Sequence, residues 1–484
     1  MDTPYTIESG RQALQAKKVS VTELVETSLA SVAAWQPHVN AYTQVLADEA
    51  LAQVKSAENL DDDENKPLLG IPIAVKDNIC TTEGKTTAAS RILANFSALY
   101  DATVISRLKN AGAIIIGKTN LDEFAMGSST EYSAVGPTKN PWDKKRVPGG
   151  SSGGSGVATS TGSALAALGT DTGGSIRLPA SFCNVVGVKP TYGRVSRFGA
   201  IAYGSSLDQI GPFARTVKDA ALMLSVMAGQ DPLDATSSPN KPADYMAACG
   251  QDIRGMTVGV PKEFFAEGLD AEVRTIIEAA LRQLEDSGAT LKTISLSLTS
   301  AGIPVYYLLA KAEASSNLAR FDALRYAPIE LAQKKLVDHY QEARGSGFGP
   351  EVKRAILMGN YALSAGYYDA WYKQASKVRT LIRRQYEDAF KEVDVIAGPV
   401  APEPAFEFGS KTDDPYAMYL ADALTVPISV AGLPAISVPA GFTKQNLPVG
   451  LQIAAPHFME ERMFQVAYAY EQMNEWWQQV PKLS

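Results

Sequence analysis

Apolar residues near the beginning of the chain recur at the spacing of one helix face. Ser20 and Glu23, just before them, have the pattern of a capping box, in which each side chain bonds the backbone N–H of the other residue. The pattern predicts a surface helix that begins after Ser20. Its apolar face is formed by Leu24, Val25, Leu29, Val32 and Trp35.

A helical pattern followed by a short apolar run occurs three times further along the chain. Alternation of helices and buried strands is typical of α/β proteins. The pattern therefore predicts an α/β protein with a large sheet. The three helix and strand pairs are 102–110 with 113–116, 271–287 with 290–296, and 376–391 with 393–397.

The uncharged run 423–442 is about as long as a membrane span. It contains Pro427, Pro434 and Pro439, and proline in a helix interior removes a hydrogen bond and clashes with the preceding turn. We therefore expect short buried strands here and no membrane helix.

Several stretches read as loops or as helices with a polar face. The acidic residues 61–65 predict a solvated loop, and residues 231–243 are the best loop candidate elsewhere. Tyrosines and arginines over 361–386 predict a helix packed by its tyrosines, with a solvated basic face and no contact with RNA. Residues 137–213 are dense in Gly, Ser and Thr, and we interpret them as a shaped site.

Composition indicates a folded protein with an acidic balance. The chain has 484 residues, 45% of them hydrophobic, and 45 Lys and Arg against 52 Asp and Glu give a net charge of −7. The length allows one to three domains. Without a Lys/Arg block, the chain is not expected to hold a nucleic acid backbone by itself.

Cysteine and histidine usage narrows the chemistry further. The three cysteines form no CxxC pair, which favours a reducing compartment, and the beginning of the chain has no secretory pattern, so a cytoplasmic protein is expected. The three histidines form no HxH or HxxxH pair. This scarcity excludes most histidine-ligated metal chemistry, and no metal site is expected.

Two loops rich in serine and glycine, 149–156 and 169–180, are the strongest candidates for catalysis. Serine needs a base to remove its proton, and with histidine so scarce the base is a desolvated lysine or a carboxylate. Lys76, at the end of the predicted strand 71–75, is well placed, although a solvent-facing Lys76 paired with Asp77 is equally consistent with the sequence.

Other interpretations of these loops are weaker. Ser151 lies in a G-x-S-x-G pattern, but the charged residues 144–148 precede it where a nucleophile elbow needs an apolar strand. No GK[ST] follows to make a phosphate loop. Asp171 and Asp286 each precede a pattern of Ser or Thr then Gly, but Asp286 reads as a helix end with a glycine cap, so a protease pair is not expected.

Three motifs resemble those of the amidase signature family at the family's spacing. They are GIPIAVKDN with Lys76, PGGSSGGS with Ser151, and GTDTGGSIRLPA with Ser175, and the resemblance covers about residues 20 to 470. It implies a large central mixed, twisted β-sheet with helices on both faces. It also implies one domain over 1–484, with a signature core at about 66–215 and an insertion or loop region at about 231–350.

The resemblance also implies a Ser-Ser-Lys triad. Ser175 would be the acyl-forming nucleophile, Ser151 the bridging serine on a cis peptide, and Lys76 the general base. Ser152 would orient Ser151. Backbone N–H groups would form the oxyanion hole, and they belong to Thr172, Gly173, Gly174 and Ser175.

The stretches NLDEFAMGSSTE and EASSNLARFD resemble one branch of the family, the A subunits of glutamyl-tRNA(Gln) amidotransferases. The branch implies a glutaminase that supplies ammonia to convert Glu-tRNA(Gln) to Gln-tRNA(Gln), a carbon–nitrogen ligase reaction with glutamine as amido donor. Its partners would be B and C subunits. The B subunit would hold most of the tRNA and would use ATP and Mg²⁺. This chain would hold no cofactor. A standalone amidase and a catalytically silent scaffold are the alternatives.

The same branch suggests residues that bind glutamine. Asp422 would meet the α-amino group, and Tyr306 and Arg354 are weaker assignments. Two departures concern this pocket. The branch usually has two adjacent arginines where this chain has Arg354 and Ala355, and it often has glutamine where this chain has Leu178.

Overall fold

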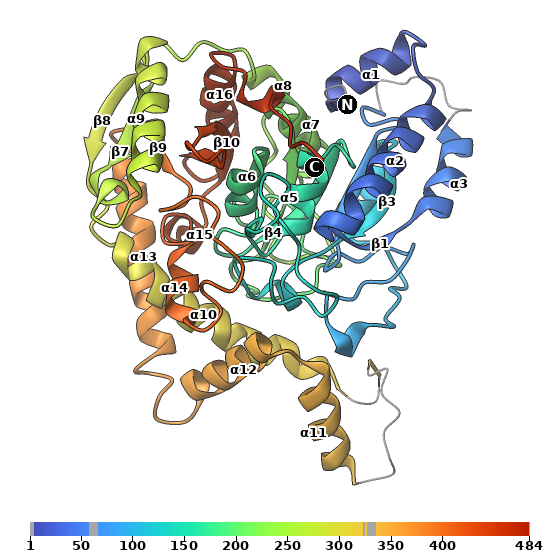
Figure 1. The fold of residues 1–484 in the computed structure, drawn as a ribbon. Coiled ribbons are helices and arrows are strands. Elements are labelled where there is room, and N and C mark those ends of the chain that lie inside the picture. Colours follow the sequence, from blue (N-terminus) through green and yellow to red (C-terminus); the bar gives the residue numbers. More distant parts are fainter. Residues whose placement is uncertain (1–3, 58–65, 323–324, 327–334, 484) are drawn as a thin grey trace.

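Every strand in the described part of the chain belongs to one eleven-stranded sheet. The computed structural model describes residues 4–57, 66–322, 325–326 and 335–483 (Figure 1). The sheet order is β1-β3-β2-β4-β6-β5-β10-β11-β9-β7-β8. The strands are β1 (Tyr42–Val45), β2 (Pro72–Lys76), β3 (Ile114–Thr119), β4 (Ala166–Asp171), β5 (Val186–Lys189), β6 (Gln209–Ala214), β7 (Thr257–Pro261), β8 (Thr290–Ile294), β9 (Val395–Pro399), β10 (Ala435–Phe442) and β11 (Pro448–Ala454).

The sheet is mixed, as predicted. Strand β2 runs parallel to its neighbours β3 and β4, and β7 runs parallel to β8 and β9. The remaining neighbours pair antiparallel. Because parallel strands end at the same edge of a sheet, the residues that follow β2, β3 and β4 are brought together there.

Helices cover both faces of the sheet, which confirms the predicted fold class. Alternate residues of β2 mark the two faces, since Ile73 and Val75 belong to one apolar cluster and Ala74 to another. The first face carries α4 (Thr103–Asn110), α7 (Val217–Met227), α8 (Tyr245–Ala248), α9 (Ala271–Asp286) and α16 (Glu460–Glu471). The opposite face carries α2 (Val21–Val39), α3 (Ala47–Ala57), α5 (Gly153–Ser160) and α6 (Arg177–Cys183).

A third apolar cluster covers the far end of the second face. Ile396 of β9 belongs to it, while the neighbouring Val395 and Ala397 pack on the first face. The helices of this cluster are α10 (Gly302–Asn317), α12 (Pro350–Leu363), α13 (Tyr372–Ala389) and α15 (Val426–Ala431). The other helices are α1 (Ile7–Gln15), α11 (Leu336–Gly347) and α14 (Pro415–Leu420), and α11 projects from the body at the bottom of Figure 1.

Most of the predicted elements are present. The first predicted helix is α2, which has the capping box of Ser20 and Glu23 and continues to Val39. The three predicted helix and strand pairs are α4 with β3, α9 with β8, and α13 with β9. Residues 231–243 form a loop, as expected. The acidic loop predicted at 61–65 lies outside the described residues.

The prediction of short strands throughout 423–442 is wrong in its first half. Residues Val426–Ala431 form α15, and only Ala435–Phe442 form a strand, β10. Pro427 stands in the first turn of α15, where its missing N–H removes no helical hydrogen bond, and Gly432 ends the helix at φ 79°. Among the described residues, no helix is long and apolar enough to cross a membrane.

The prediction of one tyrosine-packed helix over 361–386 is also wrong. Two helices cover this stretch, because α12 ends at Leu363 and α13 begins at Tyr372. Between them Gly366 has a φ of 87°, a conformation that suits glycine and ends a helix. The tyrosines near the break are exposed: Tyr361, Tyr367 and Tyr368.

The stretch predicted as an insertion or loop region, 231–350, contributes to the central sheet. It contains β7 and β8, which form one end of the sheet, and the buried helix α10. That residues 1–484 form one domain with a signature core remains a prediction.

Candidate active site

Lys76 ends strand β2 in the middle of three parallel strands and is fully buried. Its Nζ lies 2.8 Å from both Ser151 Oγ and Ser152 Oγ, and 2.9 Å from Thr170 Oγ1. These hydroxyls come from the turn before α5 and from the end of β4. The lysine therefore joins the two serine-rich loops by hydrogen bonds to residues that are distant from it in the sequence.

Burial lowers the pKa of Lys76 to about 7, because the ammonium loses its hydration. The carboxylates of Asp122, Asp171 and Asp208 act in the opposite direction and favour the charged form. A lysine with a pKa close to neutrality is unprotonated in part at pH 7. It then has a lone pair that can accept a proton from a hydroxyl within hydrogen-bond distance.

The alternative of a solvent-facing Lys76 paired with Asp77 is wrong. Asp77 faces the other way and pairs with Lys118, whose Nζ lies 3.7 Å from its Oδ1. Thr43 also donates to the Asp77 carboxylate, at 3.0 Å. Successive side chains of a strand point to opposite faces, so the side chains of Lys76 and Asp77 point away from each other and do not pair.

Ser151 follows a cis peptide bond between Gly150 and Ser151. The Asp122 N–H donates to the Ser151 carbonyl at 3.2 Å, and the Asp122 carboxylate accepts from the N–H groups of Thr130 and Tyr132 at 2.9 and 3.1 Å. A Cβ at Gly150 would lie 2.3 Å from Asp122 Oδ2. The turn that carries Ser151 is therefore built around Asp122 and has no room for a side chain at 150.

Asp122 was missed by the sequence analysis. It is completely buried, and burial raises its pKa to about 7. The signal that was available is its place three residues after β3, since β3 lies beside β2 and ends at the same edge as Lys76. A carboxylate at that edge faces the same region as the lysine.

The loop from Thr172 to Ser175 follows β4 and leads into α6. In the part of the chain that the structure describes, none of its four backbone N–H groups has a hydrogen-bond acceptor. The loop is buried, with Ser175 only 5% exposed. Buried N–H groups without an acceptor, beside a hydroxyl, can stabilise an oxyanion that forms on a carbonyl attacked there.

The two serine loops are in direct contact. The Ser152 N–H donates to the Ser175 carbonyl at 3.2 Å, and Ser152 Oγ, besides accepting from Lys76, donates to the Thr170 carbonyl at 3.1 Å. No hydrogen bond joins Ser151 Oγ to Ser175 Oγ in the structure. Lys76 is thus hydrogen-bonded to Ser151 and not to Ser175.

Ser175 opens into a pocket that also brings together two of the predicted substrate residues, Tyr306 and Asp422. Both lie against the glycines before Ser175, since a Cβ at Gly173 would meet the Tyr306 ring at 2.8 Å and one at Gly174 would meet Asp422 Oδ1 at 2.7 Å. Ser128 donates to Asp422 Oδ2. Asp422 Oδ1 is buried without a hydrogen-bond partner among the described residues.

Arg354, which was predicted to bind substrate, and Leu178, which departs from the branch pattern, do not line this pocket. Arg354 does not line it, and its guanidinium pairs with Glu351, which does. Leu178 is fully buried in an apolar cluster with Val147 and Phe182. The leucine therefore belongs to the packing of α6 and not to the wall of the pocket.

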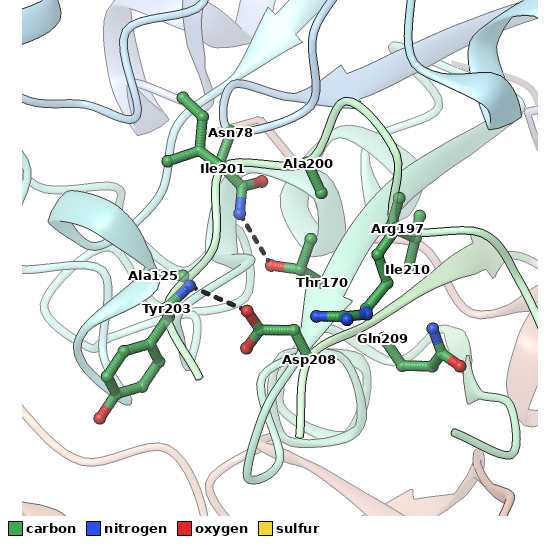
Figure 2. Close-up of a pocket in the computed structure, with 10 residues that line it drawn as sticks. All are labelled: Asn78, Ala125, Thr170, Arg197, Ala200, Ile201, Tyr203, Asp208, Gln209 and Ile210. Atoms are coloured by element: carbon green, nitrogen blue, oxygen red, sulfur yellow. Dashed lines mark hydrogen bonds between the residues drawn. The ribbon is translucent and has the colours of Figure 1, made fainter. Parts of the chain in front are cut away.

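A second pocket is lined by Thr170, Asn78, Tyr203 and Asp208 (Figure 2). Asn78 donates to Thr170 Oγ1 at 3.1 Å, and Asp208 accepts from Tyr203 N–H at 2.8 Å and from Thr172 Oγ1 at 2.7 Å. Asp208 therefore holds the side chain of Thr172, the first residue of the loop that leads to Ser175. Thr170 and Asp208 were not identified from the sequence, although Thr170 stands in the motif GTDTGGSIRLPA that carries the family resemblance.

Comparison with known proteins gives a family model described as "Amidase", which matches residues 23–464. The A subunit of the glutamyl-tRNA(Gln) amidotransferase of Koribacter versatilis is 53% identical over 468 residues, which cover 96% of this chain and 98% of that protein.

Two solved structures are also similar. The crystal structure of the A subunit of the glutamyl-tRNA(Gln) amidotransferase of Thermotoga maritima has 43% identity and a TM-score of 0.80, covering 97% of this chain and 94% of its own. The native peptide amidase of Stenotrophomonas maltophilia has 30% identity and a TM-score of 0.81, covering 97% of this chain and 96% of its own.

Proposed function

The chain is an enzyme that belongs to the amidase family, and we propose that it is the glutamine-hydrolysing A subunit of a glutamyl-tRNA(Gln) amidotransferase. It supplies ammonia from glutamine, and a B subunit uses the ammonia with ATP and Mg²⁺ to convert Glu-tRNA(Gln) to Gln-tRNA(Gln). A C subunit completes the complex. The tRNA is held mainly by the B subunit, which agrees with the net charge of −7 on this chain.

The observation that carries this proposal is the pocket shared by Ser175 and Asp422. Ser175 contributes a hydroxyl to the pocket, and Asp422 offers a buried carboxylate oxygen that has no partner among the described residues. A buried carboxylate favours a cationic partner, such as the α-ammonium of an amino acid. An amino acid whose side chain is an amide meets both requirements, and glutamine is such a molecule.

In the first half-reaction, Ser175 Oγ attacks the side-chain amide carbon of glutamine. Ser151 takes the Ser175 proton and passes its own to the unprotonated Lys76, 2.8 Å away. The negative charge on the amide oxygen is stabilised by N–H groups of residues 172–175. Lys76 then returns a proton through Ser151 to the amide nitrogen, which leaves as ammonia, and a glutamyl ester on Ser175 remains.

In the second half-reaction, water replaces ammonia and the same groups act again. Lys76 and Ser151 remove a proton from the water, which attacks the ester carbonyl. The proton then returns to Ser175 Oγ as glutamate leaves. Glutamine and water are thereby converted to glutamate and ammonia, and no group of this chain is consumed.

The proposed setting is the cytoplasm. Cys80, Cys183 and Cys249 are all free thiols in the structure, as expected of a reducing compartment. The triad works through side chains and backbone N–H groups of this chain alone, so the scheme assigns the chain no metal or cofactor.

The decisive test replaces Ser175 with alanine in the assembled amidotransferase. Glutamine-dependent formation of Gln-tRNA(Gln) should be lost, while formation from added ammonium chloride should continue at the wild-type rate. The ammonium reaction shows that the variant is folded and assembled. Retained glutamine-dependent activity would contradict the assignment of Ser175, and absence of both reactions in the wild type would contradict the proposed function.

A standalone amidase is the second candidate, and the likeness to the peptide amidase of Stenotrophomonas maltophilia favours it. The two functions differ in their need for partners. If the chain copurifies with B-type and C-type subunits and hydrolyses glutamine faster in their presence, the amidotransferase assignment holds. Equal hydrolysis of several small amides by the isolated chain would favour the standalone amidase.

A further inference from the structure

The pocket beside Ser175 contains two acidic side chains and no basic one. Asp422 and Glu351 line it, and no lysine or arginine is among its described lining residues. Glutamine carries an α-carboxylate as well as an α-ammonium. If Asp422 receives the ammonium, the carboxylate would be brought close to Glu351 and repelled unless a positive charge compensates it.

Lys311 of α10 lies directly behind this part of the pocket. It is only 1% exposed, and its Nζ donates to the hydroxyl of Tyr419, which lines the pocket, and lies 3.4 Å from Glu351 Oε1. The ammonium also lies over two rings, 4.6 Å from the centre of Tyr419 and 5.1 Å from that of Tyr307. Each of these three contacts is a pocket-lining residue.

The charges of this cluster do not cancel. Glu351 pairs through one oxygen with Lys311 and through the other with Arg354. Two cations therefore face one carboxylate, and one positive charge is in excess. The Lys311 ammonium is desolvated, whereas the Arg354 side chain is 36% exposed and screened by water, so the uncompensated charge acts most strongly at Lys311.

The neighbouring helix leaves room for this lysine. Glu351 and Met358 of α12 both contact Lys311 Nζ, and Ala355 lies between them on the same helix face, 1% exposed. A Cβ at Gly359 would lie 2.0 Å from the Lys311 carbonyl, so α10 and α12 touch backbone to backbone here. The small residues at 355 and 359 are what allow Lys311 to reach the pocket wall.

The two binding groups are also correctly placed relative to each other. The α-ammonium and α-carboxylate of glutamine are attached to the same carbon atom, so their partners must lie at the same end of the pocket. Tyr419 lies in the last turn of α14 and Asp422 follows two residues after the helix ends, with the Asp422 N–H donating to the Tyr419 carbonyl at 3.2 Å. The hydroxyl to which Lys311 donates and the free oxygen of Asp422 are thus brought to one region by a single turn.

We propose that Lys311 is the residue that makes the enzyme specific for amides carrying an α-carboxylate, by compensating that charge electrostatically from behind Tyr419, whose hydroxyl accepts from Lys311 and donates to Glu351 at 3.2 Å. The inference rests on the proposed glutaminase function. Lys311 does not line the pocket itself and is therefore a positioning residue; it has no part in breaking the amide bond. Position 355, where the resemblance implies a second arginine, is occupied by alanine in this chain.

The test compares two amides in the full chain, assembled with its partner subunits. One is glutamine, and the other is 4-aminobutanamide, which is glutamine without the α-carboxylate. Lys311→Met should lower kcat/KM for glutamine about 10- to 100-fold, mainly through KM, and leave 4-aminobutanamide hydrolysis within about twofold of the wild type. Lys311→Arg keeps the charge and should retain most of the preference for glutamine.

A matched control removes the other cation of the cluster. Arg354→Met should reduce the preference for glutamine less than Lys311→Met does, because Arg354 is partly exposed. Equal losses on both amides in Lys311→Met would show a structural role and overturn the proposal, as would a larger carboxylate-specific loss in Arg354→Met or an unchanged preference. Failure of the wild type to hydrolyse glutamine would instead refute the proposed function.

Discussion

Arg177 and Asp171 form a fully buried ion pair, with Arg177 Nε 3.0 Å from Asp171 Oδ2. The pair spans the loop that carries Ser175, since Asp171 ends β4 and Arg177 begins α6. The guanidinium also donates to the Gly173 carbonyl at 3.2 Å. This ion pair therefore holds both ends of the loop that carries Ser175.

Removal of this arginine should destabilise the protein strongly. Arg177→Met leaves the Asp171 carboxylate buried without its cation, which costs about 3–5 kcal/mol of the free energy of unfolding. Denaturant unfolding of the purified chain would measure the change. The matched control is Lys373→Met, which breaks the exposed ion pair with Asp369 and should leave the unfolding midpoint unchanged. Equal effects of the two substitutions would contradict the bracing role.

The pH dependence of turnover should reveal the lysine. Burial lowers the pKa of Lys76 to about 7, so below that pH Lys76 is protonated and cannot accept a proton. We expect kcat for glutamine hydrolysis to be constant above pH 8 and to fall about tenfold per unit below about pH 7. A kcat that stays constant down to pH 5 would exclude Lys76 as the base.

Asp422 also titrates in this range, and its effect should be separable from that of Lys76. Burial raises the pKa of Asp422 to about 7, and only the charged carboxylate attracts an ammonium. Its titration should therefore change KM. In Asp422→Asn the inflection in kcat should remain while the inflection in KM disappears; loss of both would assign the kcat inflection to Asp422.

The same substitution tests the α-amino contact. Asp422→Asn should raise KM for glutamine about 10- to 100-fold, because a hydrogen bond between charged groups is lost. Glutaramic acid, which is glutamine without the α-amino group, supplies the control and should be hydrolysed by the variant as well as by the wild type. An equal loss on both compounds would mean that Asp422 shapes the pocket without meeting the ammonium.

Gly150 should not tolerate a side chain. Its Cβ would lie 2.3 Å from Asp122 Oδ2 and 2.4 Å from the Ser129 nitrogen, so Gly150→Ala must displace the turn that carries Ser151. We expect glutamine hydrolysis to be lost, with a destabilisation of about 1–3 kcal/mol. Gly345→Ala is the control, because a Cβ there meets no atom within 4 Å and alanine favours the helix. Wild-type activity in Gly150→Ala would contradict this account of the turn.

Local patterns in the sequence were sufficient for much of the fold and for the centre of the site. Helix caps and apolar spacing predicted α2, α4 and α9, since these depend on residues three or four positions apart. The scarcity of histidine directed attention to Lys76 and to the two serine loops. At α15 the local pattern was misleading, because an apolar segment of this composition can form either a helix or a strand. The surrounding tertiary structure decided for the helix.

The tertiary structure decided everything that depends on residues distant in the chain. The residues around Lys76 in the sequence could not show whether it is exposed and paired with Asp77, or buried and bonded to a serine. Its burial depends on β3 and β4, which lie on either side of β2. The same holds for Asp122 and for the cluster of Lys311 with Glu351 and Tyr419. Sequence determines which chemical groups are available, whereas the pKa of a lysine and the charge balance of a pocket follow from desolvation and from contacts that only folding creates.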